Sequence, residues 1–212
     1  MQQVKILRNE ALGKTIVKKL KQRGFEAFYC SDKQAALLQV LQLIPAEDVV
    51  SWGGSVTLAE IGILEAVKKR NPVIDRDTAK TLDEKVEIMR KSLLCDTFLM
   101  SSNAVSADGQ LVNIDGNGNR VAALCYGPKQ VIIIAGLNKV AGSLEAAMDR
   151  VRNIAAPINV QRFADAVTPC KKTGLCSDCQ SSDSICAQIV VTRRSRPEGR
   201  IKVVLVGENV GF

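Results

Sequence analysis

Histidine is entirely absent from the 212 residues of this chain. Its absence removes the side chain that most often acts as a general base or a metal ligand near neutral pH. Acid–base chemistry must therefore use Asp, Glu, Lys, Cys or Tyr. Aromatic residues make up only 4% of the chain, so few side chains are available to stack on nucleic-acid bases.

Long hydrophobic runs are missing as well. No window approaches the roughly 18 apolar residues of a transmembrane helix. The N-terminal stretch is polar and rich in lysine, without the apolar core of a signal peptide. We therefore expect a cytoplasmic protein with no membrane partner.

The net charge of +7 is concentrated near the N-terminus, where residues 1–24 carry seven Lys or Arg side chains and a single Glu. A basic helix face of this kind is usually solvated surface, and together with the scarcity of aromatic residues it makes nucleic-acid binding an unexpected function. Apolar residues at 46% and charged residues at 24% are ordinary for a globular domain.

The first half of the chain alternates between helical and extended patterns, which predicts an α/β fold with a mainly parallel sheet flanked by helices. Helices are expected over 2–23, 31–44, 57–69 and 77–94, and strands over 25–30, 48–52 and 72–74.

After residue 96 the pattern changes to successive strands, expected over Thr97–Val105, Leu111–Ile114, Arg120–Cys125 and Gln130–Ala135. A helix then begins at Ser143 and is expected to end before Pro157. A cysteine-rich loop at 168–187 and a C-terminal β-hairpin at 188–206 complete what we expect to be a single domain over 1–212, with antiparallel hairpins added to the parallel sheet.

The most informative local motif is the turn Gly53-Gly54-Ser55, which links a buried strand to a helix. Thr57 and Glu60 after it have the spacing of a capping box. Paired glycines allow a ligand to approach the backbone closely, while free N–H groups at a helix start favour an anion. The turn is therefore a candidate phosphate or carboxylate site, although two glycines can also simply turn a strand into a helix.

Several motifs together resemble the lactate-utilisation (LUD, YkgG-like) domain family, and the resemblance covers nearly the whole chain. They are Trp52-Gly53-Gly54-Ser55-Val56-Thr57, Ser106-Ala107-Asp108-Gly109, Leu111-Val112-Asn113-Ile114-Asp115-Gly116 and Gly118-Asn119-Arg120-Val121. The resemblance implies the fold shared by ribose-5-phosphate isomerase and the CoA transferases, with a site at the carboxyl ends of the strands.

The resemblance also implies which residues form that site. Gly53, Gly54, Ser55 and Thr57 would hold an anionic group, and Asp108, Gly109, Asp115 and Asn119 would form the opposite rim of a cleft. Asp108 and Asp115 are the only candidate catalytic residues. The alternative for both is that Asp-Gly pairs simply make turns.

Four cysteines fall within seventeen residues, as Cys170, Cys176, Cys179 and Cys186. The polar loop between them has too few apolar side chains to fold unaided. Clustered thiols in a cytoplasmic chain indicate metal binding, and four thiolates suit zinc or an iron–sulfur cluster. A redox dithiol and inert thiols remain alternatives, and neighbouring lysines are expected to lower the thiol pKa values.

The leading functional hypothesis is a LUD-domain protein that binds a small anionic metabolite in lactate or related organic-acid utilisation. One alternative is a non-catalytic electron-transfer or scaffold subunit that docks on redox partner subunits through its cysteine loop. Another is a sugar-phosphate isomerase or a CoA-transferase-like enzyme. The sequence leaves open whether the domain is catalytic, and it is compatible with a homo-oligomer.

Overall fold

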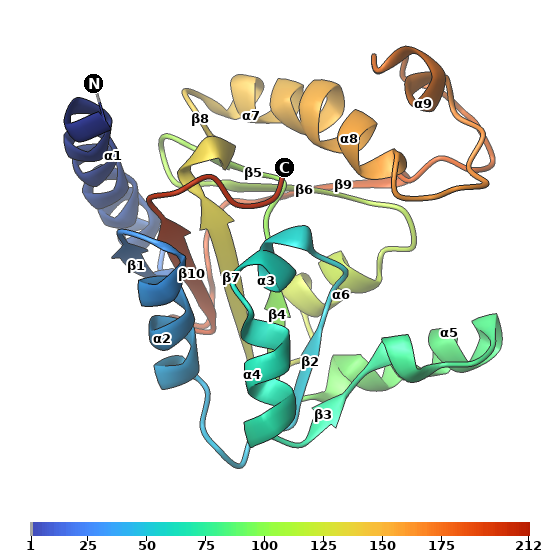
Figure 1. Cartoon of the computed structure of the whole chain (residues 1–212), viewed down its shortest axis with the longest axis horizontal. Helices are drawn as coiled ribbons and strands as arrows, with labels where there is room; N and C mark the ends of the chain where they lie inside the picture. The colour runs from blue at the N-terminus through green and yellow to red at the C-terminus, as the bar shows by residue number, and fades with distance from the viewer. Residues whose placement is uncertain (1) are drawn as a thin grey trace.

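A computed structural model describes residues 2–212. Its centre is a six-stranded, wholly parallel sheet with the strand order β1-β10-β7-β4-β2-β3. A smaller mixed sheet, ordered β8-β5-β6-β9, packs above the carboxyl ends of the parallel strands (Figure 1). The parallel sheet consists of β1 Glu26–Cys30, β10 Ile201–Val206, β7 Gln130–Gly136, β4 Thr97–Met100, β2 Val50–Trp52 and β3 Val73–Ile74; the mixed sheet consists of β8 Val140–Ala141, β5 Ala104–Ser106, β6 Leu111–Asp115 and β9 Gln188–Thr192.

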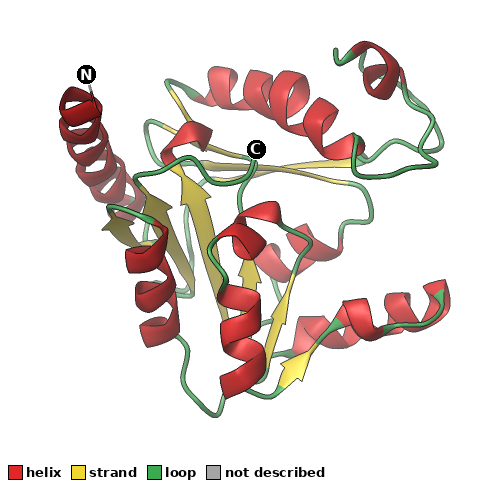
Figure 2. Ribbon diagram, viewed as in Figure 1, coloured by secondary structure: helices red, strands yellow, loops and turns green. Residues whose placement is uncertain are grey.

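Helices cover both faces of the parallel sheet (Figure 2). Because side chains alternate along a strand, Ile133 of β7 packs with Ile16 and Leu20 on one face, and Ile132 packs with Val40 and Ile63 on the other. The helices are α1 Gln2–Gln22, α2 Lys33–Leu43, α3 Val56–Glu60, α4 Ile63–Arg70, α5 Leu82–Lys91, α6 Asn119–Cys125, α7 Leu144–Arg150, α8 Ala156–Val160 and α9 Pro169–Thr173.

The predicted α/β class and parallel sheet are confirmed, but several predicted elements are wrong. The helix expected over 57–69 is broken into α3 and α4 at Gly62, whose φ of 74° interrupts the helix. The strand expected over Arg120–Cys125 is the helix α6, which buries Val121 and Leu124 at helical spacing. These short apolar runs fit either period, so tertiary packing decides between them.

The strand expected over 97–105 is also two strands. β4 lies in the parallel sheet and β5 lies in the mixed one, and Ser101-Ser102-Asn103 carries the chain between them. The helix that follows Ser143 does not end at Pro157. It continues through a π-helical turn, Val151–Ala155, into α8, and Pro157, which has no N–H to donate, is the second residue of α8 directly after that turn.

The predicted C-terminal hairpin at 188–206 is wrong. β9 pairs antiparallel with β6 in the mixed sheet, whereas β10 lies between β1 and β7 in the parallel sheet. The connection between them is docked on the end of α1, where Ser195 N–H donates to Arg23 O at 2.9 Å. The last third of the chain therefore joins the two sheets instead of extending one of them.

No helix among residues 2–212 combines the length and the apolar character needed to cross a lipid bilayer. Helix α5 extends away from the body of the domain, as Figure 1 shows. None of its residues is buried.

Candidate functional site

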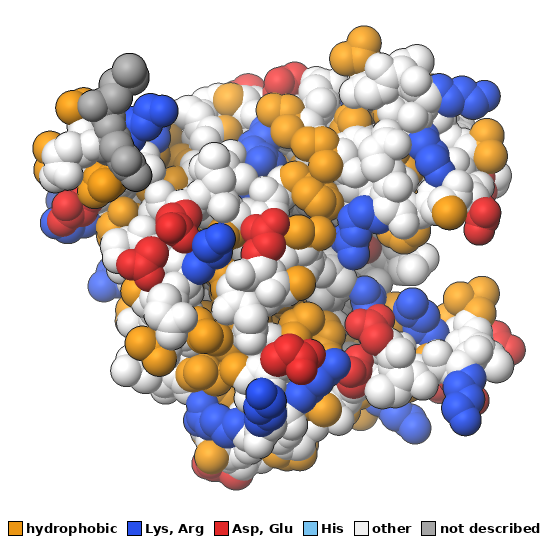
Figure 3. Space-filling model, in the orientation of Figure 1, with side chains coloured by type: hydrophobic (Ala, Val, Ile, Leu, Met, Phe, Trp, Pro, Cys, Tyr) orange, Lys and Arg blue, Asp and Glu red, His pale blue; other side chains and the backbone are white. Residues whose placement is uncertain are grey.

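A cleft of about 780 Å³ lies at the carboxyl ends of the parallel strands. In doubly wound sheets this edge is the usual ligand site, because loops from several strands converge there. Figure 3 shows the hollow between α5 and the upper part of the domain, with Lys and Arg side chains around it. Its walls include Gly54–Thr57 after β2, Arg76 after β3, Ser101–Asn103 after β4, Lys139 after β7, Asp115–Arg120 after β6, and Gly211 after β10.

The glycine pair lets two arginine side chains approach the backbone. A Cβ atom on Gly53 would lie 2.9 Å from Cδ of Arg120, and one on Gly54 would lie 2.3 Å from Nη2 of Arg76. Neither glycine has a positive φ. The backbone of the glycine pair is therefore closely approached, as predicted. The groups that approach it are the side chains of Arg120 and Arg76, and they bring positive charge to the cleft.

The predicted capping box is wrong, and this changes the role of Thr57. Ser55 is the N-cap of α3, and its hydroxyl accepts from Leu58 N at 3.4 Å. Thr57 lies inside the helix and is buried, with its hydroxyl facing the cleft. Glu60 accepts from Gly211 N at 2.8 Å and so holds the C-terminal segment over the site.

Lys139 is the most unusual side chain in the cleft. It is only 3% exposed, and its Nζ lies 2.8 Å from Oγ1 of Thr57 and 2.9 Å from Oγ of Ser101. No acidic side chain of residues 2–212 forms an ion pair with it. Burial, and then the positive charges of Arg150 and Arg120, lower the pKa of Lys139 to about 7.

Arg120 is committed to the protein itself. Its guanidinium donates to Ser101 O, Asn113 Oδ1, Asn103 Oδ1 and Ile114 O at distances between 2.6 and 3.1 Å. These bonds join the end of β4 to β6 across the two sheets. The four contacts use all the N–H groups of its two Nη atoms, and its Nε lies 3.7 Å from Oδ2 of Asp115, so Arg120 shapes the cleft and contributes charge to it.

Arg76, in contrast, is available. Its Nε is buried and has no hydrogen-bond partner, and its nearest carboxylate, Asp77, is 3.8 Å away. A buried guanidinium N–H without an acceptor is unfavourable unless a ligand or water supplies one. Because Arg76 lines the cleft, the missing acceptor would come from the cleft.

Among the predicted site residues, the structure brings Gly54, Ser55, Thr57, Asp115 and Asn119 together in this cleft. Asp115 accepts from Val121 N at 3.2 Å and lies 3.7 Å from Nε of Arg120. It therefore orients α6 and its arginine. Gly53 lies behind the cleft wall, where it packs on Arg120.

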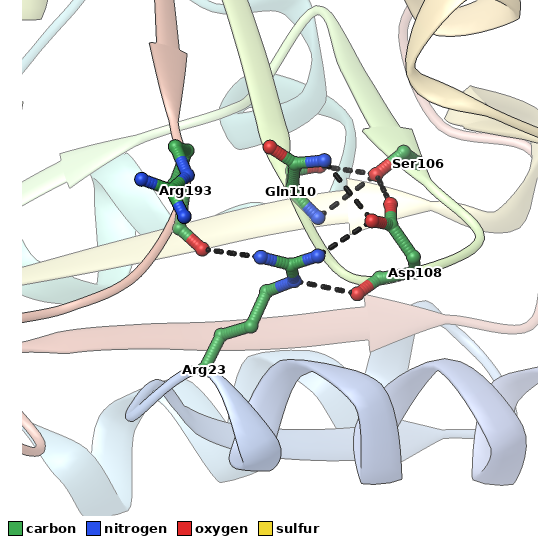
Figure 4. A network of polar contacts seen from close by, with 5 residues as sticks. All are labelled: Arg23, Ser106, Asp108, Gln110 and Arg193. Carbon is green, nitrogen blue, oxygen red and sulfur yellow. Dashed lines mark hydrogen bonds and ion pairs between the residues drawn. The ribbon is translucent and has the colours of Figure 1, made fainter.

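The structure does not bring Asp108 and Gly109 to the cleft. Gly109, at a φ of 87°, packs against the backbone of Lys19 and Leu20 in α1. Asp108 accepts from Arg23 at 2.5 Å and from Gln110 at 3.0 Å (Figure 4).

The environment of Asp108 is that of a structural contact. Hydrogen bonds from Ser106, Gln110 and Arg23 lower its pKa, with Ser106 the largest cause. The backbone of the same turn accepts from Arg23 Nε at 2.7 Å, and Arg23 also donates to Arg193 O at 3.1 Å (Figure 4). Asp108 therefore fastens the β5–β6 turn to α1. Of the predicted opposite rim, Asp115 and Asn119 lie at the cleft, whereas Asp108 and Gly109 do not.

The four clustered cysteines line a second cavity of about 440 Å³. All four are free thiols. Within residues 2–212 no group of three or more His, Cys, Asp or Glu side chains is drawn together closely enough to hold a metal ion. The cavity adjoins the cleft, because Ser182, Ser184 and Ile185 line both.

At Cys186 the pKa is shifted in the direction opposite to the lowering expected from nearby lysines. Burial, followed by the charges of Cys170, Cys176 and Cys179, raises the pKa of Cys186 to about 11. Lys171 is turned away and donates to Phe163 O and Ala164 O.

Comparison with known protein families identifies the family of this chain. The sequence model of the LUD domain family matches residues 13–206. This chain belongs to the LUD domain family. No curated protein matches it. The LUD fold is also that of a DUF162 family protein from Deinococcus radiodurans, whose crystal structure has a TM-score of 0.55 at 12% identity, over 93% of this chain and 98% of that one.

Sequence reasoning missed Arg76 and Lys139, two basic side chains of the cleft in this LUD domain. Each lies two or three residues after a parallel strand, so a basic residue shortly after an apolar run was the available signal. The burial of Lys139 without an ion pair, and of Arg76 Nε without a hydrogen-bond acceptor, are tertiary properties that the sequence pattern does not contain.

Proposed function

We propose that this LUD domain binds a small anionic metabolite, a hydroxy or oxo acid of lactate or related organic-acid utilisation, in the cleft at the ends of the parallel strands. The observation that carries the proposal is that the side chain of Arg76, whose buried Nε lacks an acceptor, lines the same cleft as Lys139, which has no ion pair among the described residues. A carboxylate supplies the acceptor that a guanidinium binds best.

The charge balance of the cleft supports this proposal. Five basic side chains line it against three acidic ones. One of the three carboxylates, Asp115, is already engaged with Arg120. The basic residues are Arg76, Lys85, Arg120, Lys139 and Arg162, and the acidic ones are Asp77, Asp115 and Asp183.

Calorimetric titration with lactate, pyruvate and ribose 5-phosphate tests the proposal and ranks the carboxylate against the sugar-phosphate alternative. Replacing Arg76 with Met should weaken binding of the preferred anion by about tenfold or more, because a hydrogen bond to a charged group contributes roughly 1.5–3 kcal/mol. The matched control is Arg90→Met, on exposed surface where Arg90 pairs only with Glu87. Equal affinity in wild type and both variants would contradict the proposal.

A second proposal concerns the cysteine loop: the four thiols hold zinc or an iron–sulfur cluster. It is supported by the position of Cys170, Cys176, Cys179 and Cys186 around one cavity, with no disulfide among them. The thiols must move closer together to share one metal; they lie on the short helix α9 and on the irregular segment after it. Thiolate ligands would tie down a loop that has almost no apolar core.

Metal analysis by native mass spectrometry, on protein purified without oxygen or chelator, tests this second proposal. One zinc per chain supports a structural clip, and a visible absorption band from an iron–sulfur cluster supports electron transfer to a redox partner subunit. Metal-free protein would contradict both the zinc and the iron–sulfur hypotheses. A redox dithiol would then remain as an alternative, and its cysteines would titrate in pairs with reductant.

A further inference from the structure

Lys139 has chemistry that anion binding alone does not use. Buried lysines are normally paired with carboxylates, because an isolated ammonium in a protein interior is costly. Lys139 instead contacts two neutral hydroxyls, on Thr57 and Ser101, and its Nζ lies at the wall of the cleft. Two of the three positions around the nitrogen are used by these contacts, which leaves one for a ligand.

Burial and the surrounding positive charges favour the neutral form of this amine. Arg150 and Arg120 both face it, and Glu60 is the acidic group with the opposite, smallest influence. With burial as the largest cause, the pKa of Lys139 falls to about 7. About half of the amines therefore carry a free lone pair at pH 7, against roughly one in a few thousand for an exposed lysine. Desolvation beside other cations is how lysine nucleophiles are activated.

We propose that Lys139 forms an imine with the carbonyl group of a small 2-oxo acid bound in the cleft. The inference rests on the proposed anion binding, because the carboxylate of the ligand is held by the uncommitted guanidinium of Arg76. The neutral amine attacks the carbonyl carbon, a C–N bond forms, and one proton moves from nitrogen to oxygen to give the carbinolamine. The C–O bond of the carbinolamine then breaks, its hydroxyl group leaves with the remaining N–H proton as one water molecule, and the C=N bond forms. No oxidant or reductant is needed.

The two hydroxyls next to Nζ suit the dehydration step. Thr57 Oγ1 and Ser101 Oγ lie within 2.9 Å of the nitrogen. From there, each can pass a proton from the nitrogen toward the departing hydroxyl group. Gly211 leaves room for this chemistry, because a Cβ there would lie 2.3 Å from Thr57 Oγ1 and 3.1 Å from Lys139 Nζ.

The test is reductive trapping of the whole chain with pyruvate and borohydride, followed by peptide mapping. Borohydride donates hydride to the imine carbon and leaves a stable carboxyethyl group on the lysine nitrogen. We expect the label on Lys139 at more than tenfold the level on any other lysine. Lys139→Met should abolish it, whereas Lys129→Met, which removes an exposed lysine paired with Asp96, should leave it unchanged.

Mapping the wild-type protein identifies the labelled lysine even if the variant folds poorly. Label spread evenly over the lysines would overturn the proposal. Calorimetry with lactate, which has a carboxylate but no carbonyl, separates the two ideas. Lactate binding without label on Lys139 removes the imine and leaves the proposed function standing, whereas no binding of either acid removes both.

Discussion

Replacing Lys139 with Met should make the stability of this domain less dependent on pH. In the folded protein the pKa of Lys139 is about 7, against an ordinary value of 10.5. Between these values the unfolded chain binds more protons than the folded one, so the free energy of unfolding of the wild type rises with pH. Below pH 7 the amine must be protonated in the interior, at a cost of roughly 4–5 kcal/mol relative to water.

The variant lacks this ionisation, so its advantage over the wild type should shrink by roughly 2–3 kcal/mol between about pH 6 and pH 9. The hydroxyls of Thr57 and Ser101 lose a partner in the variant, which costs about 1–3 kcal/mol each at every pH. That loss changes the size of the difference in free energy of unfolding between the two proteins, but it does not change how the difference depends on pH. The change of this difference with pH is therefore the informative quantity.

The measurement is urea unfolding followed by circular dichroism across this pH range, with reductant present. Other titrating groups cancel in the difference between the two proteins. Lys129→Met is the control, because Lys129 is exposed and should show no comparable change over this range. A difference between wild type and Lys139→Met that stays constant from pH 6 to pH 9 would refute a neutral amine in the cleft.

Three further predictions concern the remaining contacts. Gly54→Val should displace the arginine packed on that residue and weaken anion binding about tenfold in calorimetry, with the fold retained; Gly142→Ala, where an added Cβ contacts nothing within 4 Å, should bind normally. Asp108→Asn should lower the free energy of unfolding by about 0.5–1.5 kcal/mol at neutral pH. Because the pKa of Asp108 is depressed, this loss should disappear as acid protonates the wild-type carboxyl, and an unchanged difference at low pH would contradict the role given to it. Cys179→Ser should release any bound metal and make the loop protease-sensitive, while Cys125→Ser should do neither; intact metal content in Cys179→Ser would exclude a four-thiolate site.

Much of the fold could be predicted because it depends on local periodicity. Helices and strands alternate up to β4, and each buries a face whose spacing is visible in the residues. The errors occur where pairing is non-local. Nothing near Pro197 indicates that β9 and β10 belong to different sheets, because their partners β6 and β7 lie about 70 residues away in the sequence.

The position of the glycine turn in the site could be predicted from the sequence, but the charged side chains around it could not. The glycine turn is where the motif placed it, since a strand that ends in two glycines must come close to something. The partner of each glycine is an arginine, Arg120 or Arg76, and neither could be selected from the many basic residues of the chain. For Asp108 the motif predicted the wrong place, because an Asp-Gly turn has the same sequence whether it contacts a ligand or a helix.

A crystal structure of the protein with lactate or pyruvate tests the central claim most directly. The account predicts the carboxylate in the cleft at the ends of β2, β3 and β7, within hydrogen-bond distance of Arg76, with the rest of the ligand toward Lys139. A cleft that contains only water at saturating ligand, or a carboxylate bound elsewhere on the domain, would contradict it.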